Sequence, residues 1–148
     1  MANGDERATD PIRIFDMLSV VRRLAFWLPP ILYMAAIFHF SSESQPLPAL
    51  TEHVWDKLLH LTEYAGLGLL WCRALRSERL GWTAAMALAV VATTMYGASD
   101  EWHQSFVPLR DSSVRDWLAD TLGGALGAAG YAAAVVSMAS RRTRPLRR

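Results

Sequence analysis

Ionisable and hydrogen-bonding side chains gather at three places in an otherwise apolar sequence. They form three groups along the chain: Asp56, Lys57, His60, Glu63 and Tyr64; Tyr96, Asp100, Glu101, His103 and Gln104; Arg110, Ser113, Asp116 and Asp120. Spacings of three and four residues within the groups place side chains on one face of a helix. Histidine and carboxylate side chains perform acid–base catalysis, and arginine and lysine hold phosphate or carboxylate groups. The pattern therefore predicts a polar site built from three helices.

The candidate catalytic residues are the ones suited to moving protons. We expect His60 or His103 to act as general base, with Glu101 or Asp100 orienting it or acting as acid. Ligand binding is assigned to eight other polar side chains of the three groups: Asp56, Lys57, Tyr64, Gln104, Arg110, Ser113, Asp116 and Asp120. No GxSxG-like nucleophile is present, so the class of reaction is left open.

A bound metal ion is an alternative use of the same residues. His60-x-x-Glu63 and Asp100-x-x-His103 each place two ligand types one helical turn apart. Pairs with this spacing on two helices of a bundle can bind a metal between them. The identity of a metal or other cofactor is left open.

A polar network without a ligand is the competing interpretation. Polar side chains join membrane helices by hydrogen bonds, and for any one residue of the three groups this reading is preferred. For the whole cluster a functional site is preferred, because burying so many ionisable groups costs more free energy than adhesion between helices requires. Three hypotheses follow: an enzyme acting on a lipid-linked envelope precursor, a non-catalytic binding protein, and a scaffold for other membrane components.

Long apolar stretches must position these groups. The chain has 148 residues and is 52% hydrophobic, with a mean hydropathy of +0.14, which points to a membrane protein. A bilayer core takes about 20 apolar residues in a helix. We predict an all-α, polytopic membrane protein with four transmembrane helices at 24–40, 58–75, 80–99 and 121–140. The bundle at 24–140 forms one domain between a segment at 1–23 and a basic tail at 141–148. A cleavable signal peptide is disfavoured by the acidic residues before the first span.

Charge along the chain predicts the orientation. Twelve of the 15 lysines and arginines lie before the first span, between the second and third, or after the fourth, and three lie in the other two connections. Positively charged loops stay in the cytoplasm, so both termini are predicted to be cytoplasmic and the three polar groups to face outward, in a multi-pass protein of the plasma membrane. The formal net charge of +1 argues against nucleic acid as a partner. Membrane lipids are the expected surroundings of the arginine-rich tail.

Small residues predict how the helices pack. Gly123 and Gly127 form a GxxxG pair, which lets a neighbouring backbone approach closely. We expect this face to pack within the chain, against the alanines of the third span, although an oligomer formed through the Gly123/Gly127 face is the alternative. The single cysteine, Cys72, excludes a disulfide framework within the chain.

The order of these motifs resembles the VanZ-like family of small integral membrane proteins. The similarity rests on Ser41 and Ser42, on DKLLHLTEY from Asp56 to Tyr64, and on YGASDEWHQSFVPLRDSSVRDWLADTLGGALG from Tyr96 to Gly127. It extends over about 27–130. At Leu109 such proteins often have glycine.

The resemblance implies a role at the cell envelope, since the founding member is associated with reduced susceptibility to the glycopeptide teicoplanin. An envelope lipid, a lipid-linked precursor or a glycopeptide is then the expected partner. The family's motif residues match positions that charge and spacing had selected, together with one proline: Asp56, Lys57, His60, Tyr64, Asp100, Glu101, His103, Gln104, Pro108, Arg110, Ser113 and Asp116.

Overall fold

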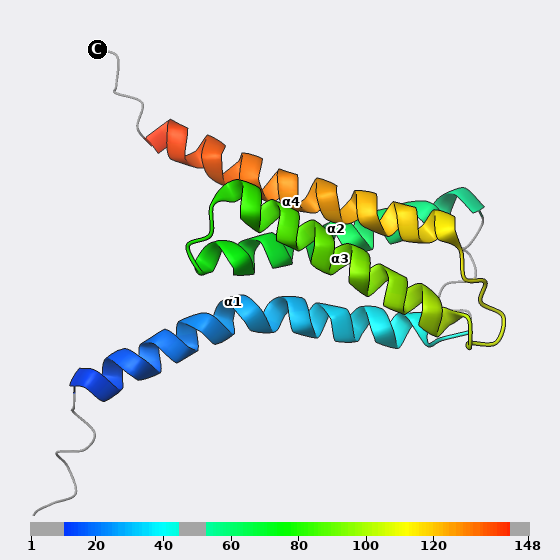
Figure 1. The fold of residues 1–148 in the computed structure, drawn as a ribbon, viewed down its shortest axis with the longest axis horizontal. Helices are drawn as coiled ribbons and strands as arrows, with labels where there is room; N and C mark the ends of the chain where they lie inside the picture. The colour runs from blue at the N-terminus through cyan, green and yellow to red at the C-terminus, as the bar shows by residue number, and fades with distance from the viewer. Residues whose placement is uncertain (1–10, 45–52, 143–148) are drawn as a thin grey trace, which may run out of the picture.

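Four helices make up the described part of the chain. A computed structural model describes the backbone of residues 11–44 and 53–142 and the side chains of 17–44 and 57–142. The helices are α1 (Pro11–Ser41), α2 (His53–Ser77), α3 (Trp82–Gln104) and α4 (Val114–Arg142) (Figure 1). The described ranges contain no strand, which confirms the all-helical prediction. The helix α1 begins at Pro11, well before the predicted span at 24–40, and continues through Pro29 and Pro30.

Successive helices run in opposite directions (Figure 1). The beginning of α1, the connection between α2 and α3, and the end of α4 lie at one end of the molecule, which we call the α2–α3 end. The end of α1, the beginning of α2 and the connection between α3 and α4 lie at the opposite end, the α3–α4 end. Because the three polar groups of the sequence lie near these latter termini, the topology brings them to the α3–α4 end.

The closest packing in the molecule joins α2 to α4 through glycine. A Cβ atom at Gly127 would collide with the carbonyl oxygen of Ala65, and one at Gly123 with that of Leu61. Similarly, a Cβ atom at Gly68 of α2 would overlap the backbone of Gly124. Packing of this glycine face within the chain is thus confirmed, but its main partner is α2 and not the alanines of the third span, because the backbone of α2 occupies the space that the missing side chains leave.

The alanines of α3 contribute to an apolar core at the α2–α3 end. Ala85 and Ala89 are fully buried with Cys72 of α2 and Ala128 of α4. We call these four residues the apolar cluster. Larger side chains, such as Trp71 and Tyr131, close it from the sides.

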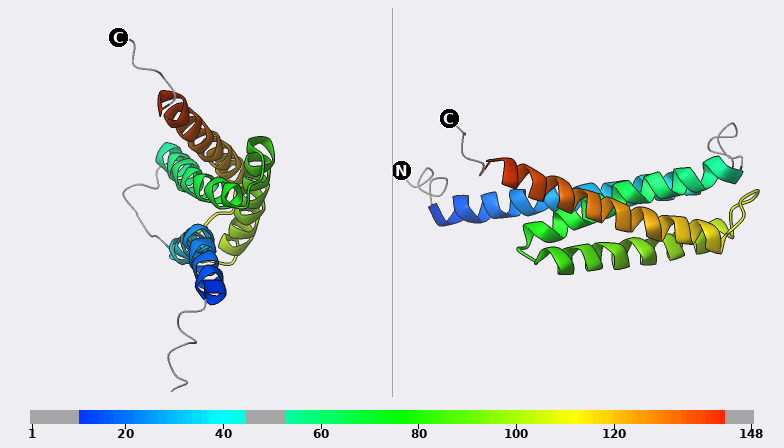
Figure 2. Two further views of the ribbon diagram at one scale, coloured as in Figure 1. Left: turned by 90° about the vertical axis from the view of Figure 1, so that its left-hand side faces the viewer. Right: turned by 90° about the horizontal axis from the view of Figure 1, so that it is seen from above.

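The first helix stands apart from the other three. It packs on α2 and at a few positions on α3, and makes no comparable contact with α4 within the described ranges (Figure 2). Trp27 of α1 meets Trp71 edge to face, with ring centroids 5.8 Å apart, and its Nε1 donates to Glu78 at 3.0 Å. The remaining perimeter of α1 exposes large apolar side chains such as Leu28, Leu32 and Phe40. Such a surface suits contact with lipid.

Two of the helices are long and apolar enough to cross a membrane. They are Met17–Ser41 of α1 and Val114–Arg142 of α4, each with a mean hydropathy of 1.5 over its most apolar window. These two helices, with their largely exposed apolar surfaces, support a membrane protein.

Candidate functional site

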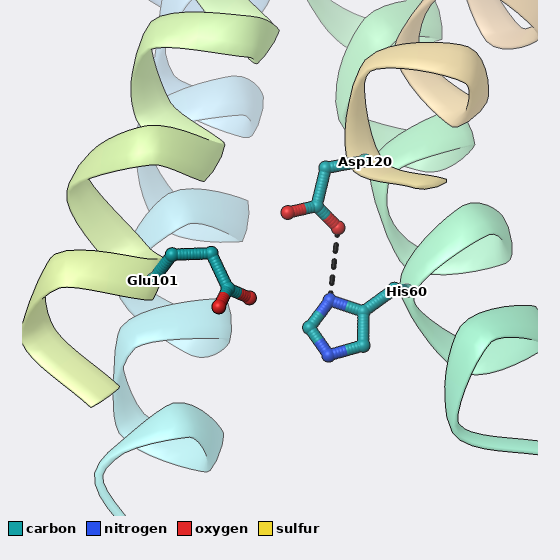
Figure 3. A group of neighbouring side chains, drawn as sticks. All are labelled: His60, Glu101 and Asp120. Carbon is teal, nitrogen blue, oxygen red and sulfur yellow. Dashed lines mark hydrogen bonds and ion pairs between the residues drawn. The ribbon is translucent and has the colours of Figure 1, made fainter. Parts of the chain in front are cut away.

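The α3–α4 end contains a buried group of one histidine and two carboxylates from three different helices. His60 of α2, Glu101 of α3 and Asp120 of α4 are 8%, 6% and 0% exposed. The Nδ1 of His60 donates to the Oδ1 of Asp120 at 2.9 Å, and the carboxylate of Glu101 faces this pair from α3 (Figure 3). One nitrogen or oxygen atom of each residue lies within 4.8 Å of those of the other two. We call these three residues the His–carboxylate triad.

A glycine makes room for the triad. A Cβ atom at Gly97 would lie 2.9 Å from the Oδ2 of Asp120 and 3.3 Å from the ring of Tyr64. The absence of a side chain there allows α3 to approach the Asp120 carboxylate. Sequence reasoning did not select Gly97, although it lies inside the YGASDE segment that carries the family resemblance.

Asp100 lies beside the triad and holds two further polar side chains. Its Oδ2 accepts a hydrogen bond from Nε2 of Gln104 at 3.0 Å and a longer one from the hydroxyl of Tyr64 at 3.4 Å. Asp100 and Gln104 are almost completely buried and Tyr64 completely so. The Tyr64 bond links α2 to α3, the Gln104 bond lies within α3, and both side chains act here as partners of a carboxylate.

An ion pair links α2 to the first turn of α4. The Nζ of Lys57 donates to the Oδ1 of Asp116 at 2.5 Å. The carboxylate is almost buried, whereas the lysine side chain is 41% exposed. The charge of Lys57 is therefore neutralised within the chain, and Arg110 is the cation better placed to meet an external anion.

Glu101 connects α3 to the segment that leads into α4. Its Oε2 accepts the backbone N–H of Ser113 at 2.6 Å. Glu101 lies beyond the predicted span at 80–99, and burial raises the pKa of its carboxyl, despite the opposing effect of the Ser113 bond. The protonated form is thus favoured relative to an exposed glutamate.

Four buried polar atoms at this end have no hydrogen-bond partner among the described residues. They are Oδ1 of Asp100, Oε1 of Glu101, Nε of Arg110 and Oδ2 of Asp120. Buried polar atoms are almost always hydrogen-bonded in folded proteins, and an unpaired one costs about 1–3 kcal/mol. Their concentration at one end makes this end the candidate functional site.

The two histidines predicted as alternative bases have different surroundings. His103 is turned toward α1, where its ring lies 4.5 Å from that of Phe38. The hydroxyl of Ser42 donates to the carbonyl of Phe38, so its oxygen accepts from Nε2 of His103, at 3.0 Å. His60 alone lies in the triad. Ser42 was noted in the sequence only as part of the family resemblance, and its contact with His103 was not foreseen.

The four-residue metal set suggested by spacing is not the set that the structure assembles. His60 is retained, but Glu101 and Asp120 take the places expected for Glu63, Asp100 and His103. The physical reason is the packing of α4 against α2, which inserts Asp120 beside His60, while His103 faces α1. The side chain of Asp56 lies outside the described residues.

The segment between α3 and α4 bends sharply at Leu109. This residue has a φ of 65° and an 81% exposed side chain. Such a backbone conformation favours glycine. Leucine thus stands where proteins of the family pattern often have glycine, and the backbone bend is formed by a residue with a Cβ atom. The bend leads directly to Arg110.

Comparison with known proteins identifies the family. No curated protein and no solved structure matches the sequence. The sequence model of the VanZ/LLP1 family, in contrast, matches residues 12–136, which include all four helices almost entirely and every residue of the triad. The chain therefore belongs to the VanZ/LLP1 family.

Proposed function

We propose that this VanZ/LLP1 protein is a multi-pass protein of the plasma membrane, with four membrane-crossing helices and both termini in the cytoplasm. The alternating directions of the helices and the two strongly apolar helices are consistent with this arrangement. The excess of lysine and arginine at the α2–α3 end and in the terminal segments supports the orientation. The α3–α4 end then faces the outside of the cell.

We propose further that this outer end binds the anionic head group of an envelope lipid, such as a lipid-linked cell-wall precursor. The observation that carries the proposal is the buried Nε of Arg110, which has no hydrogen-bond partner among the described residues although the Glu63 carboxylate lies near enough to interact with its charge. A guanidinium group can bind phosphate through two parallel hydrogen bonds, for which the N–H of Nε is one suitable donor. Carboxylates around it can accept hydrogen bonds from hydroxyl or amino groups of the same head group.

A role in glycopeptide susceptibility follows from this binding. The founding member of the family is associated with reduced teicoplanin susceptibility, and a lipid held at the outer end of the bundle would connect this chain to the same effect. A protein that holds or alters such a lipid there would lower the sensitivity of the cell to the antibiotic, as the family resemblance implies. The same polar end would serve if the glycopeptide itself were bound.

The test compares two arginines near the beginning of α4. Arg110 and Arg115 lie five residues apart near the beginning of α4, and Arg115 is exposed. We expect the native chain to lower teicoplanin susceptibility in a Gram-positive host, Arg110→Gln to abolish the effect, and Arg115→Gln to retain it at equal membrane abundance. The purified native chain and the Arg115→Gln variant should bind to vesicles that contain lipid-linked precursor, and the Arg110→Gln variant should not. Equal behaviour of the two variants would refute the assignment to Arg110.

Catalysis and binding are separated by Glu101→Gln. His60 pairs with Asp120, and Glu101 faces the pair, so for an enzyme we propose Asp120 in the orienting role that the sequence had suggested for Glu101 or Asp100. In an enzyme, His60 would be the general base and Glu101 the acid. If Glu101→Gln retains lipid affinity but loses the cellular effect, the site is catalytic. If affinity and effect decline together, the site only binds.

A scaffold is the second candidate function. It is favoured by the bonds that tie the helices together at the same end, from Lys57 to Asp116 and from Tyr64 to Asp100. A scaffold predicts that substitutions there reduce the abundance of the protein or of its partners in the membrane, without a specific loss of lipid binding. Quantitative immunoblotting of the membrane fraction distinguishes the two outcomes.

A further inference from the structure

Two oxygens of the His–carboxylate triad are buried without a partner. Asp120 is completely buried, and its Oδ2 has no hydrogen-bond partner among the described residues, whereas Oδ1 accepts from His60. Glu101 is 6% exposed, and its Oε1 is likewise unpartnered, whereas Oε2 accepts from Ser113. Each carboxylate is thus held in place by one oxygen and leaves the other available. Figure 3 shows the Glu101 carboxylate directed toward the space beside Asp120 and His60.

Carboxyl groups outnumber permanent positive charges around the triad. Five of them lie in or beside it, those of Glu63, Asp100, Glu101, Asp116 and Asp120, and two side chains with a permanent positive charge lie among them, Lys57 and Arg110. Lys57 neutralises Asp116. Burying the remaining negative charge is costly unless a cation accompanies it. A positive ion beside Glu101 and Asp120 would satisfy both unpartnered oxygens at once.

We propose that His60, Glu101 and Asp120 bind one divalent transition-metal ion, such as Zn²⁺ or Mn²⁺. An imidazole nitrogen with two carboxylate oxygens is a donor set suited to these ions, whereas Mg²⁺ and Ca²⁺ prefer oxygen alone. The three ligand atoms already lie within 4.8 Å of one another. Ligand atoms at about 2.1 Å from a tetrahedral Zn²⁺ ion are about 3.4 Å from one another. Side-chain rotations that shorten the present distances of up to 4.8 Å by about 1.4 Å at most would complete the site.

The surrounding residues are arranged as the outer shell of such a site. The backbone N–H of Ser113 fixes the orientation of Glu101, and Gly97 leaves space for Asp120. Outer contacts of this kind orient metal ligands and raise affinity. The remaining coordination positions are available to water or to a phosphate oxygen of a bound lipid. The metal site itself does not depend on the proposed lipid, because its three ligands all belong to the chain.

The test measures metal binding in the absence of any lipid substrate or antibiotic. The full chain is purified in detergent with an affinity tag that contains no histidine, and EDTA removes any metal that it carries. The metal-free protein is then dialysed against Zn²⁺ or Mn²⁺, and elemental analysis gives the number of metal ions bound per chain. We expect one ion per chain, with an affinity that rises with pH because the ligands must lose protons. Native protein that retains no stoichiometric ion of either kind would overturn the proposal.

The matched control is Asp111, an exposed carboxylate in the connection at the same end of the molecule. Glu101→Gln should lower the affinity for Mn²⁺ by about tenfold or more, since it removes a charged ligand, whereas Asp111→Asn should leave the affinity unchanged. Equal affinity in the Glu101→Gln variant and the native chain would overturn the assignment, as would an equal loss in Asp111→Asn.

A measurement on the native chain avoids the effect of substitutions on folding. Pulsed electron paramagnetic resonance of the Mn²⁺-loaded protein detects the nitrogen of a coordinated imidazole. We expect coupling to one histidine nitrogen. A bound ion without such coupling would exclude His60 as a ligand. If metal binding fails while the vesicle assay still shows lipid binding that depends on Arg110, only the metal site is refuted and the proposed function stands.

Discussion

The two ends of the α2–α3–α4 bundle are built from the same three helices but differ in what they bury. At the α2–α3 end, the apolar cluster of Cys72, Ala85, Ala89 and Ala128 contains small side chains in close contact. At the α3–α4 end, the same helices bury His60, Glu101 and Asp120, and four polar atoms there have no partner among the described residues. Near the apolar cluster, the indole Nε1 of Trp71 is the one such atom.

The apolar cluster stabilises the bundle without any buried charge, whereas the polar end buries charged groups. Close packing of three helices requires small residues and no charge, as the apolar cluster demonstrates. The buried carboxylates are therefore not needed to hold the bundle together, and functional sites commonly reduce stability in this way. Removing a buried carboxylate of the triad should therefore raise the free energy of unfolding, whereas disturbing the close packing of the helices should lower it.

The largest effect is expected where α4 meets the backbone of α2. Replacing Gly127 by leucine should lower the free energy of unfolding by about 3 kcal/mol or more, because the added side chain overlaps the carbonyl of Ala65 and cannot be accommodated by rotation. Gly130, three residues later, has no atom within 4 Å of its Cβ position, so Gly130→Leu is the control and should be tolerated. Thermal unfolding in detergent, followed by circular dichroism, measures both. Similar losses in the two variants would show that close packing against α2 is not the cause.

A smaller loss is expected at the ion pair of the polar end. Lys57→Met leaves the carboxylate of Asp116 buried without its partner, which should cost about 1–2 kcal/mol, less than for a fully buried pair because the lysine is partly exposed. Lys57→Arg, which retains the charge, should preserve most of the stability. The unfolding assay at pH 7.5 compares them. If the Lys57→Met variant were as stable as the native chain, the ion pair between Lys57 and Asp116 would contribute nothing to the free energy of unfolding.

A gain in stability is expected from Glu101→Gln. The amide retains an oxygen for the N–H of Ser113 but carries no buried charge, so the metal-free variant should be more stable than the native chain by about 1 kcal/mol. The cellular effect on teicoplanin susceptibility should decline at the same time. Lower stability in this variant would show that the charge of Glu101 supports the fold.

The stability of the metal-free protein should also depend on pH through Glu101. Because burial raises the pKa of Glu101, the folded state keeps a proton that the unfolded state has lost. The stability of metal-free protein should therefore decrease as the pH rises from the ordinary range of a glutamate through the raised pKa. Glu101→Gln should flatten that part of the curve. Melting temperatures recorded from pH 4 to pH 8 provide the check, and an unchanged slope in the variant would assign the effect to another group.

The smallest effect is expected at the bend before Arg110. Leu109 adopts a left-handed conformation that glycine accepts without strain. Leu109→Gly should raise the free energy of unfolding by about 0.5 kcal/mol, the difference between relieved strain and added flexibility of the unfolded chain. Leu109→Ala keeps the Cβ atom and should bring no gain. If alanine stabilises as much as glycine, the exposed leucine side chain, and not its backbone, is the source of the difference.

Helical spacing and charge predicted which residues gather at one end, and topology explains why. His60, Asp100, Glu101 and Asp120 lie near helix termini that meet at the same end of an alternating bundle. The specific partners were not predictable. Whether His60 meets Asp120 or a carboxylate of α3 depends on how far each helix is rotated about its own axis, and that rotation is fixed by the contacts of Gly68, Gly123 and Gly127.

The helix boundaries show a similar limit. The predicted span at 24–40 identifies the uncharged part of α1, but the helix starts at Pro11 because charged residues interrupt apolar runs without interrupting helix formation. Leu109 marks a position where the family pattern indicated a special backbone conformation, and the structure provides it. The contact between His103 and Ser42 could not be predicted, since it requires the placement of α1 against α3.

The bond between His60 and Asp120 joins residues sixty positions apart in the chain. A ribosome that adds about 5–20 residues per second needs roughly 3–12 seconds to proceed from one to the other. During that interval the histidine of α2 lacks the carboxylate that will eventually hold it. The synthesis of α4 therefore completes the triad, and a chain truncated before α4 would expose a polar surface of α2 that cellular quality control can recognise.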